Sequence, residues 1–354
     1  MKQTPLALSP KIHRAGLTVV GGVVAFFLVA APAHALIAPI RVKGGSGAQV
    51  LPAVNANDFG WSANSTARPN HYDAFAQRKS GGAIKKVNGP RTIGYMGAFD
   101  GDTSTIFYQQ VGGYSSDIYT DDFLAPGTRT PVSAINTTLW EYQPSVSPGY
   151  ILFGRNDFRR ASAPWKILLY NRNNGQMTLL DQATYRCRCV FPGQVTDQYA
   201  TWTRCSRSGC AVKYYDIADH TTSQVANPHG KLQYVPSVSA STGDIYFAAS
   251  GFGCGKHVAL YRWNPAAGGD PDRIATLPDG YDVFWSTFTL DGSGGSHQDV
   301  YFDRTVCGGH YYADIYELND ADTAAPRSAG IAMGAASGSA RVHAMAPNQT
   351  PAGL

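Results

Sequence analysis

The sequence predicts an all-β protein, a six-bladed β-propeller with four-stranded antiparallel blades. Short strands rich in aromatic and β-branched residues recur in units of about 45 residues, with Gly and Asn turns between them. Only 15% of the residues are charged and 44% are hydrophobic, so the chain has enough apolar residues for a large core. A β-sandwich is the structural alternative, but its strands would not recur as four-stranded units of nearly constant length.

The first residues have the pattern of a secretory signal. Residues 1–14 are basic and carry no acid, residues 15–33 are uncharged and apolar, and Ala33-His34-Ala35 fits the small-x-small cleavage rule. The alternative is an uncleaved anchor, because 19 uncharged residues nearly span a bilayer. We therefore expect a signal peptide over 1–35 and a secreted or extracytoplasmic protein with no membrane span after cleavage.

The repeat is marked by one aromatic residue in the first strand of a recurring pair, and these residues are spaced by 46, 46, 49, 45 and 55 positions. They are Trp61, Phe107, Phe153, Trp202, Phe247 and Phe302. The next strand carries a partner aromatic, and these partners are Phe75, Tyr119, Tyr170, Tyr215, Tyr261 and Tyr316. Upstream of each pair from the second unit onward lies a further short strand, such as YQPSVS at 142–147. The aromatics are expected to pack blade against blade.

The two ends of the propeller are expected at 36 and 324. Residues 36–42 (LIAPIRV) form an apolar strand that would close the ring as an outer strand. Residues 325–354 are rich in Gly, Ala, Ser and Pro without any pattern, which predicts a flexible tail.

Two repeats resemble those of TolB-type six-bladed propellers. The segments QPSVSPGYILFGRN with KILLYNRNNGQMTLL, and VPSVSASTGDIYFAAS with VALYRWNP, are similar to the family pattern PSxSPDGxxIxFxS followed by IYxxD and a Gly turn. The other four repeats match loosely. The resemblance implies the propeller fold. It does not imply the TolB envelope role, because too few residues precede the first unit for the N-terminal domain of TolB.

Basic and aromatic residues concentrate in the loops expected at one end of the propeller, and acidic residues in the turns at the other. Arg forks match carboxylates and phosphates, and Tyr stacks on sugars or bases, so the basic end is a candidate site for an anionic ligand. The alternative is ordinary solvated charge. The candidate ligand-binding residues are Arg155, Asp157, Arg186, Arg188, Arg204, Lys256, His257, Arg304, His310 and Tyr311.

Six cysteines lie at the same end: Cys187, Cys189, Cys205, Cys210, Cys254 and Cys307. An even number in an exported protein favours disulfides over a metal site. Cys205 with Cys210 spans a tight hairpin loop, and Cys254 with Cys307 joins equivalent loops of neighbouring units. Cys187 and Cys189 are left unassigned, and a Cys187–Cys205 exchange stays open.

Known catalytic motifs are missing: the sequence has neither GxSxG nor HExxH. The pairs Asp100/Asp102, Asp270/Asp272 and Asp320/Asp322 are spaced like calcium ligands, but no distal Glu completes a loop. We expect no cofactor, with calcium as the one ion to consider, and no metal site.

The net charge of +4 is too small to indicate nucleic acid as a partner. The sequence favours a monomeric, non-catalytic binding module with a protein or glycan partner. The ligand bound on its basic face would be an anion or a glycan. The alternative is an enzyme, a lyase or hydrolase, acting on an acidic polysaccharide. Lyase chemistry would use Arg to neutralise a uronate and Tyr or His to move a proton.

Overall fold

The computed structural model describes residues 40–65, 67–113, 115–125, 127–157, 159–160, 162–184, 190–206, 208–227, 232–251, 255–283, 289–290, 299–307 and 313–319. All of them belong to one compact unit, Ala35–Leu354. Their regular structure consists of strands, and this part of the chain contains no helix that could cross a membrane.

Three sheets are four-stranded antiparallel meanders, in which each strand pairs with the next one along the chain. The first holds β2 (Gln49–Val54), β3 (Asp58–Ser65), β4 (Arg68–Arg78) and β5 (Lys85–Lys86). The second holds β14 (Val190–Val195), β15 (Tyr199–Ser206), β16 (Gly209–Asp216) and β17 (Thr221–Gln224). The third holds β18 (Leu232–Val238), β19 (Ile245–Ser250), β20 (Ala259–Trp263) and β21 (Asp272–Thr276).

Two further meanders share one eight-stranded sheet. One holds β6 (Ile93–Phe99), β7 (Thr105–Gly112), β8 (Ser115–Asp122) and β9 (Thr130–Pro131). The other holds β10 (Trp140–Val146), β11 (Tyr150–Asn156), β12 (Trp165–Asn171) and β13 (Met177–Ala183). A single parallel bridge, from Ser116 to Trp140, joins them.

The last sheet joins the two ends of the described chain. It contains β22 (Tyr281–Val283), β23 (Thr289–Leu290), β24 (Asp299–Val306), β25 (Ala313–Asn319) and β1 (Ile40–Lys43). Because β1 pairs antiparallel with β25, the N-terminal strand is an outer strand of the C-terminal sheet. The predicted closing strand is therefore confirmed for residues 40–42, while residues 36–39 lie outside the described part.

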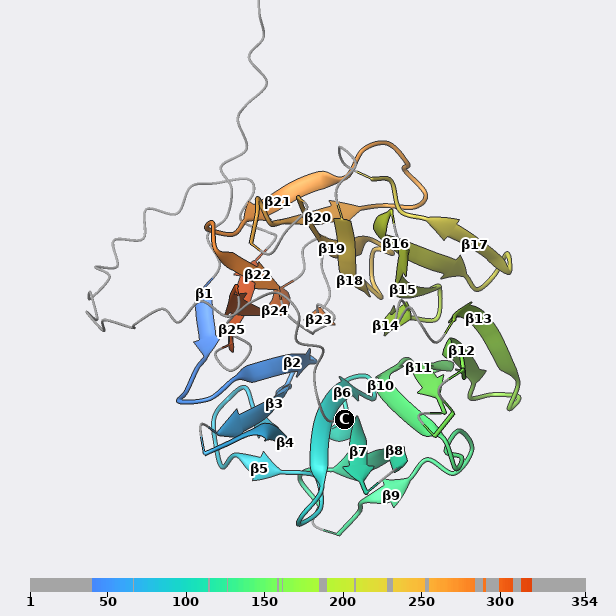
Figure 1. Ribbon diagram of the computed structural model, residues 1–354. Coiled ribbons are helices and arrows are strands. Elements are labelled where there is room, and N and C mark those ends of the chain that lie inside the picture. The colour runs from blue at the N-terminus through green and yellow to red at the C-terminus, as the bar shows by residue number, and fades with distance from the viewer. Residues whose placement is uncertain are drawn as a thin grey trace, which may run out of the picture. The chain divides into compact units, whose positions relative to one another are not determined.

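The sheets follow one another around an axis, which confirms the β-propeller fold (Figure 1). The first strands of the meanders lie toward this axis, and the last strands, such as β5, β13 and β17, lie at the rim (Figure 1). Apolar faces of neighbouring sheets form the core, as where Phe302 and Tyr316 share a cluster with Tyr246 and Leu260. The count of six blades stays a prediction, because the strands group into five sheets.

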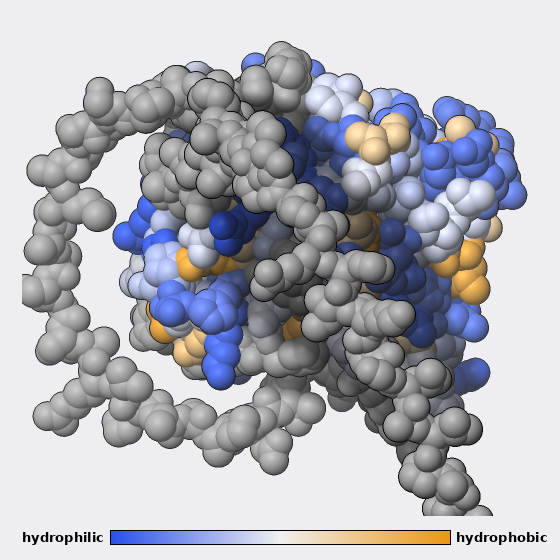
Figure 2. Space-filling model, turned by 90° about the horizontal axis from the view of Figure 1, so that it is seen from above, coloured by the Kyte–Doolittle hydropathy of each residue, from blue (hydrophilic) through white to orange (hydrophobic). Residues whose placement is uncertain are grey.

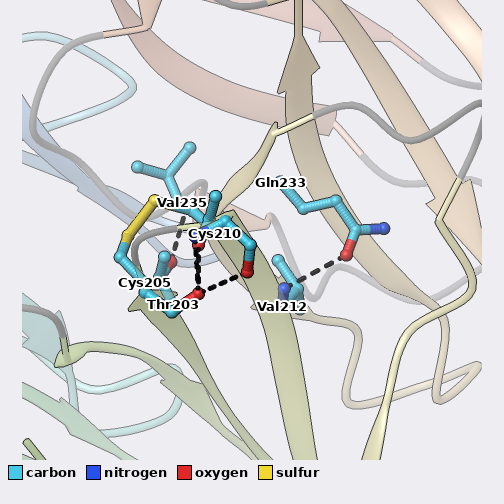
Figure 3. The surroundings of a disulfide bond; sticks show 9 residues. Thr203, Cys205, Cys210, Val212, Gln233 and Val235 are labelled. Carbon is cyan, nitrogen blue, oxygen red and sulfur yellow. Dashed lines mark hydrogen bonds between the residues drawn. A yellow bond between two sulfur atoms is a disulfide. The ribbon is translucent and has the colours of Figure 1, made fainter.

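The innermost strands share a kink. Each of β2, β6, β10, β14 and β18 shifts register at the same place in its sequence. In three of them a residue with positive φ precedes a proline: Leu51 (52°), Gln143 (47°) and Val235 (50°). The backbone N–H groups freed at the kink of β10 and β18 donate to side chains of the preceding unit. Gln143 N bonds to Gln109 Oε1 at 3.3 Å and Val235 N to Thr203 Oγ1 at 3.1 Å (Figure 3).

Proline and glycine alternate at the kink because the strands approach each other there. A Cβ on Gly97 would lie 2.5 Å from the carbonyl oxygen of Pro144, and one on Gly193 would lie 2.7 Å from that of Pro236. Both positions therefore need a residue without a side chain. Kink residues of β2, β6, β10 and β14 line a narrow pocket, formed by Leu51, Pro52, Met96, Gly97, Gln143, Pro144 and Gly193.

The repeated aromatics lie in consecutive strands as predicted, and the register shows which of them face each other. Tyr108, not Phe107, takes the place of the repeated aromatic, because it pairs with Tyr119 and stacks on it at 6.1 Å. Trp61 and Phe75 pair in the same way, at 5.7 Å. The residues opposite the next two aromatics, Phe153 and Trp202, are Leu168 and Lys213, rather than the aromatics Tyr170 and Tyr215. The register of two paired strands decides which residue of one strand lies opposite which residue of the other, and the amino-acid composition does not show this register.

Candidate functional site

Three of the candidate arginines occupy equivalent positions. Arg155 in β11, Arg204 in β15 and Arg304 in β24 each follow the repeated aromatic of their strand by two residues. Side chains two apart in a strand share a face. Because the three positions are equivalent in equivalent strands, all three lie toward the same end of the propeller, where the strand turns into the next hairpin.

Arg155 is bound inside its own sheet. Its Nε donates to Oε1 of Glu141 at 2.7 Å, and its Nη2 donates to the carbonyl oxygen of Ile135 at 2.6 Å. Glu141 is fully buried and the side chain of Arg155 is 17% exposed. The guanidinium also lies 5.2 Å from the ring centroid of Phe153. Its charge is thus balanced by a carboxylate of the chain itself.

Arg204 is bound to the neighbouring sheet. Its Nη1 donates to Oδ1 of Asp181 at 2.7 Å and to the carbonyl oxygen of Gln182 at 2.6 Å. The second carboxylate oxygen of Asp181 accepts from the indole N–H of Trp202 at 2.8 Å. One aspartate of β13 therefore holds two side chains of β15, and Arg204 ties two units of the propeller together.

Asp157 is engaged locally. Its carboxylate lies 3.2 Å from Nε of Arg159 and 3.4 Å from Nε of Arg160. These arginines are 57% and 81% exposed, so the pairs are screened by water and contribute little.

Arg304 differs from its two equivalents. Its guanidinium lies 3.8 Å from the ring centroid of Tyr316 and 4.5 Å from that of Tyr281, and it donates a hydrogen bond to the hydroxyl of Tyr316. Among the residues that the structure describes, no carboxylate forms an ion pair with it. Aromatic faces hold the guanidinium in place without neutralising it.

A chain of backbone hydrogen bonds gathers other candidates near Arg304. Gly280 N donates to Gly255 O at 3.2 Å, and Cys307 N donates to Gly280 O at 2.8 Å. These bonds join the loop of Lys256 and His257 to the strand end that follows Arg304. We call Lys256, His257, Asp279, Tyr281, Arg304 and Tyr316 the Arg304 corner. Within it, His257 Nδ1 lies 3.9 Å from Asp279 Oδ1, and both side chains are more than 80% exposed.

A half-buried carboxyl adjoins this corner. Asp282 Oδ1 accepts from the hydroxyl of Tyr234 at 2.6 Å and from the backbone N–H of Val283 at 2.8 Å. Burial raises the pKa of Asp282, although these hydrogen bonds act in the opposite direction. The pKa of the Tyr234 hydroxyl is also raised by burial, and further by the charge of Asp282. Neither residue was selected from the sequence, because a lone Tyr or Asp carries no local signal.

The disulfide prediction is confirmed in part. Cys205 and Cys210 form a disulfide across the β15–β16 hairpin, with Cα atoms 3.9 Å apart (Figure 3). Cys307 is also disulfide-bonded, and its Sγ lies 2.5 Å from where a Cβ on Gly255 would sit. The predicted partner Cys254, which precedes Gly255, lies outside the described residues, as do Cys187 and Cys189. The Cys254–Cys307 pair therefore stays a prediction.

Four candidate site residues fall outside the described part of the chain: Arg186, Arg188, His310 and Tyr311. Within that part, no three His, Cys, Asp or Glu side chains cluster as metal ligands would. Asp100, which the sequence paired with Asp102, is held by Arg172 through two hydrogen bonds of 2.7 and 2.8 Å. On the side of the molecule seen in Figure 2, hydrophobic residues form small separate patches among polar ones.

Comparison with known proteins identifies the fold. No protein-family model and no curated protein matches the sequence. The structure is similar to TolB from Acinetobacter baumannii, with a TM-score of 0.51 and 15% identity over 74% of this chain; the match spans 63% of the TolB chain. It is also similar to a protein assigned as TolB from Agrobacterium tumefaciens, with a TM-score of 0.51 and 12% identity. That match covers 77% of this chain and 90% of the other. An oligogalacturonate lyase in complex with manganese matches with a TM-score of 0.48 and 8% identity. That match covers 80% of this chain and 96% of the lyase chain. At these identities the likeness is one of fold alone: the chain has a β-propeller fold similar to that of TolB.

Proposed function

We propose that this protein is an exported six-bladed β-propeller that binds an anionic, carboxylate-bearing ligand at the Arg304 corner without catalysis. In this proposal the three four-stranded meanders are three of the blades, and the two meanders of the eight-stranded sheet are two more. The C-terminal sheet, which β1 closes, is the sixth. Export rests on the N-terminal signal pattern, and N-terminal sequencing of the secreted protein, expected to begin at Leu36, tests it.

The observation that carries the proposal is the contrast among the three equivalent arginines. Arg155 and Arg204 hold carboxylates of the chain, which shows that this position in the repeat suits a carboxylate. Arg304 is fixed by Tyr281 and Tyr316 instead. Among the described residues no acceptor other than the Tyr316 hydroxyl bonds to Arg304, so its remaining N–H groups can donate as a fork to a carboxylate supplied from outside.

The surroundings favour an anion over a cation. Lys256 and His257 share the corner with Asp279, whose side chain is 82% exposed and whose Oδ1 lies 3.9 Å from Nδ1 of His257. Within the described part of the chain, no three His, Cys, Asp or Glu side chains cluster as the ligands of a hard cation would. An acidic glycan fits this combination of charge and aromatic rings.

The test uses oligogalacturonate and its methyl-esterified form, which has the same length without the charges. Isothermal titration calorimetry is expected to show binding of the charged form only. Arg304→Gln should weaken that binding at least about tenfold, since one charge-assisted hydrogen bond contributes about 1.5–3 kcal/mol. The control is Arg262→Gln, a partly exposed arginine of β20 that lies 3.5 Å from Asp272. Equal binding of the ester, or full binding by Arg304→Gln, would contradict the proposal.

A second function, turnover of an acidic polysaccharide, is favoured by one observation. Asp282 is a half-buried carboxyl with a raised pKa next to the corner, and such a group can act as a general acid. The same samples decide between the two functions. Chain shortening of oligogalacturonate that stops in Asp282→Asn would identify an enzyme, whereas binding with no shortening supports the binding module. A tetraglutamate peptide that binds in place of the glycan would identify an acidic protein as the partner.

A further inference from the structure

The outer strands of the propeller differ in how well they are protected against pairing with another chain. An outer strand exposes unpaired backbone N–H and C=O groups, and proteins guard such edges with short strands, lysines, prolines or charges. Strand β5 is two residues long and consists of Lys85 and Lys86, and β9 is two residues long and ends in Pro131. Strand β17 has four polar residues. Strand β21 has five and begins with Asp272 and Arg273.

Strand β13 has none of these protections along its first part. It is seven residues long, Met177–Ala183, and starts with Met-Thr-Leu-Leu. It pairs with β12 on one side only, among the described strands, and lies at the rim (Figure 1). Leu179 is 49% exposed, which is high for a large apolar side chain in a strand.

The hydrogen-bond pattern shows which groups face outward. Asn171 N donates to Gln176 O at 2.8 Å, so Gln176 bonds inward to β12. Because bonding direction alternates along an antiparallel strand, Thr178 also bonds inward, and the N–H and C=O groups of Met177 and Leu179 point to the open edge. Leu179 lies opposite Leu168 of β12, and the register of this strand pair shifts directly after it, where Asp181 lies opposite Ile167.

The charge of β13 does not oppose self-pairing. Its one charged residue, Asp181, is already held by Arg204 at 2.7 Å and by the indole of Trp202. Two copies of β13 placed side by side would therefore bring no unpaired like charges together. Two copies of β5 would instead place lysine against lysine.

We propose that β13 is a self-association edge, where a second copy of this chain adds its own β13 antiparallel around a two-fold axis near Leu179. Such an interface is isologous, so one exposed strand supplies both halves. A single strand pair buries less area than a standard stable interface, and the dimer is accordingly weak and concentration-dependent. The monomer expected from the sequence is the form present in dilute solution. This proposal does not depend on ligand binding at the Arg304 corner.

Sedimentation velocity of the full chain, from low micromolar to near-millimolar concentration, tests the proposal. The weight-average mass is expected to rise toward that of a dimer for the unchanged protein. Leu179→Lys places a charge at the edge and should abolish the rise. The matched control, Thr222→Lys, makes the same substitution type at an exposed residue of the outer strand β17 and should leave it unchanged.

Hydrogen exchange gives a second measurement on the unchanged protein. Amide exchange of Met177 and Leu179, whose N–H groups face the open edge, should slow as the concentration rises, while that of 221–224 should not. A constant monomer mass over the whole range would overturn the proposal. So would association that persists in Leu179→Lys, because it would place the contact elsewhere.

Discussion

Three arginines occupy the same position in the repeat but differ in what surrounds them. Arg155 and Arg204 contact carboxylates, whereas Arg304 contacts aromatic rings. The first two arginines meet Glu141 and Asp181, and their charges are absorbed into the framework of the propeller. Arg304 meets two tyrosine rings and forms no ion pair among the described residues. The comparison shows that a residue's place in a repeat sets the end of the blade at which it lies, whereas its neighbours in space set whether its charge is paired within the protein.

The difference also separates stability from binding. Removing a carboxylate from the first kind of position leaves a poorly solvated arginine without its partner, which is destabilising. Changing Arg304 removes no ion pair among the described residues, and we expect it to alter binding rather than folding.

The largest effect is expected for Glu141→Ala. The carboxylate is fully buried and holds both Arg155 and the hydroxyl of Thr137, at 2.7 Å each. Its removal leaves Arg155 without an ion-pair partner and creates a cavity beside it. The free energy of unfolding should therefore fall by about 3–5 kcal/mol. Urea unfolding followed by tryptophan fluorescence measures it. Replacing both residues by methionine should recover most of the loss, and a single-variant effect below about 1 kcal/mol would show that the pair is not structural.

A smaller loss is expected for Asp181→Ala. The side chains of Arg204 and Asp181 are 36% and 21% exposed, so water partly replaces the lost partner. The indole N–H of Trp202 also loses its acceptor. We expect a decrease of about 1–3 kcal/mol in the free energy of unfolding, measured as for Glu141→Ala. An unchanged unfolding midpoint would mean that solvent satisfies both groups.

The smallest effect is a pH dependence at Asp282, beside the Arg304 corner. Burial raises the pKa of Asp282, so the folded protein binds this proton more tightly than the unfolded chain. The stability contributed by protonated Asp282 is therefore present at low pH and is lost as pH rises from the ordinary carboxyl pKa through the raised one. Asp282→Asn retains an acceptor for Tyr234 and does not titrate.

The difference in unfolding free energy between Asp282→Asn and the unchanged protein should consequently shift in favour of the variant as pH rises. Thermal unfolding at a series of pH values from acidic to neutral measures this shift. A difference that stays constant with pH would indicate that Asp282 titrates alike in the folded and unfolded states.

Much of the fold could be read from spacing. The aromatic repeat, the turns and the apolar N-terminal strand indicated the propeller and its β1–β25 closure. The hairpin position of Cys205 and Cys210 indicated their disulfide. The site was less accessible to this reasoning. The sequence grouped Arg155, Arg204 and Arg304 by position, but it could not show that Glu141 and Asp181 neutralise two of them.

The sequence by itself determined the strand periodicity, the repeat length and the end of the propeller at which the arginines lie, because these follow from the two-residue alternation of side chains and the order of turns. The tertiary structure decided the rest. Register placed Tyr108 rather than Phe107 opposite Tyr119. Contacts between strands far apart in the chain set the partners of each charge, and a charge becomes structural or available only through its neighbours in space.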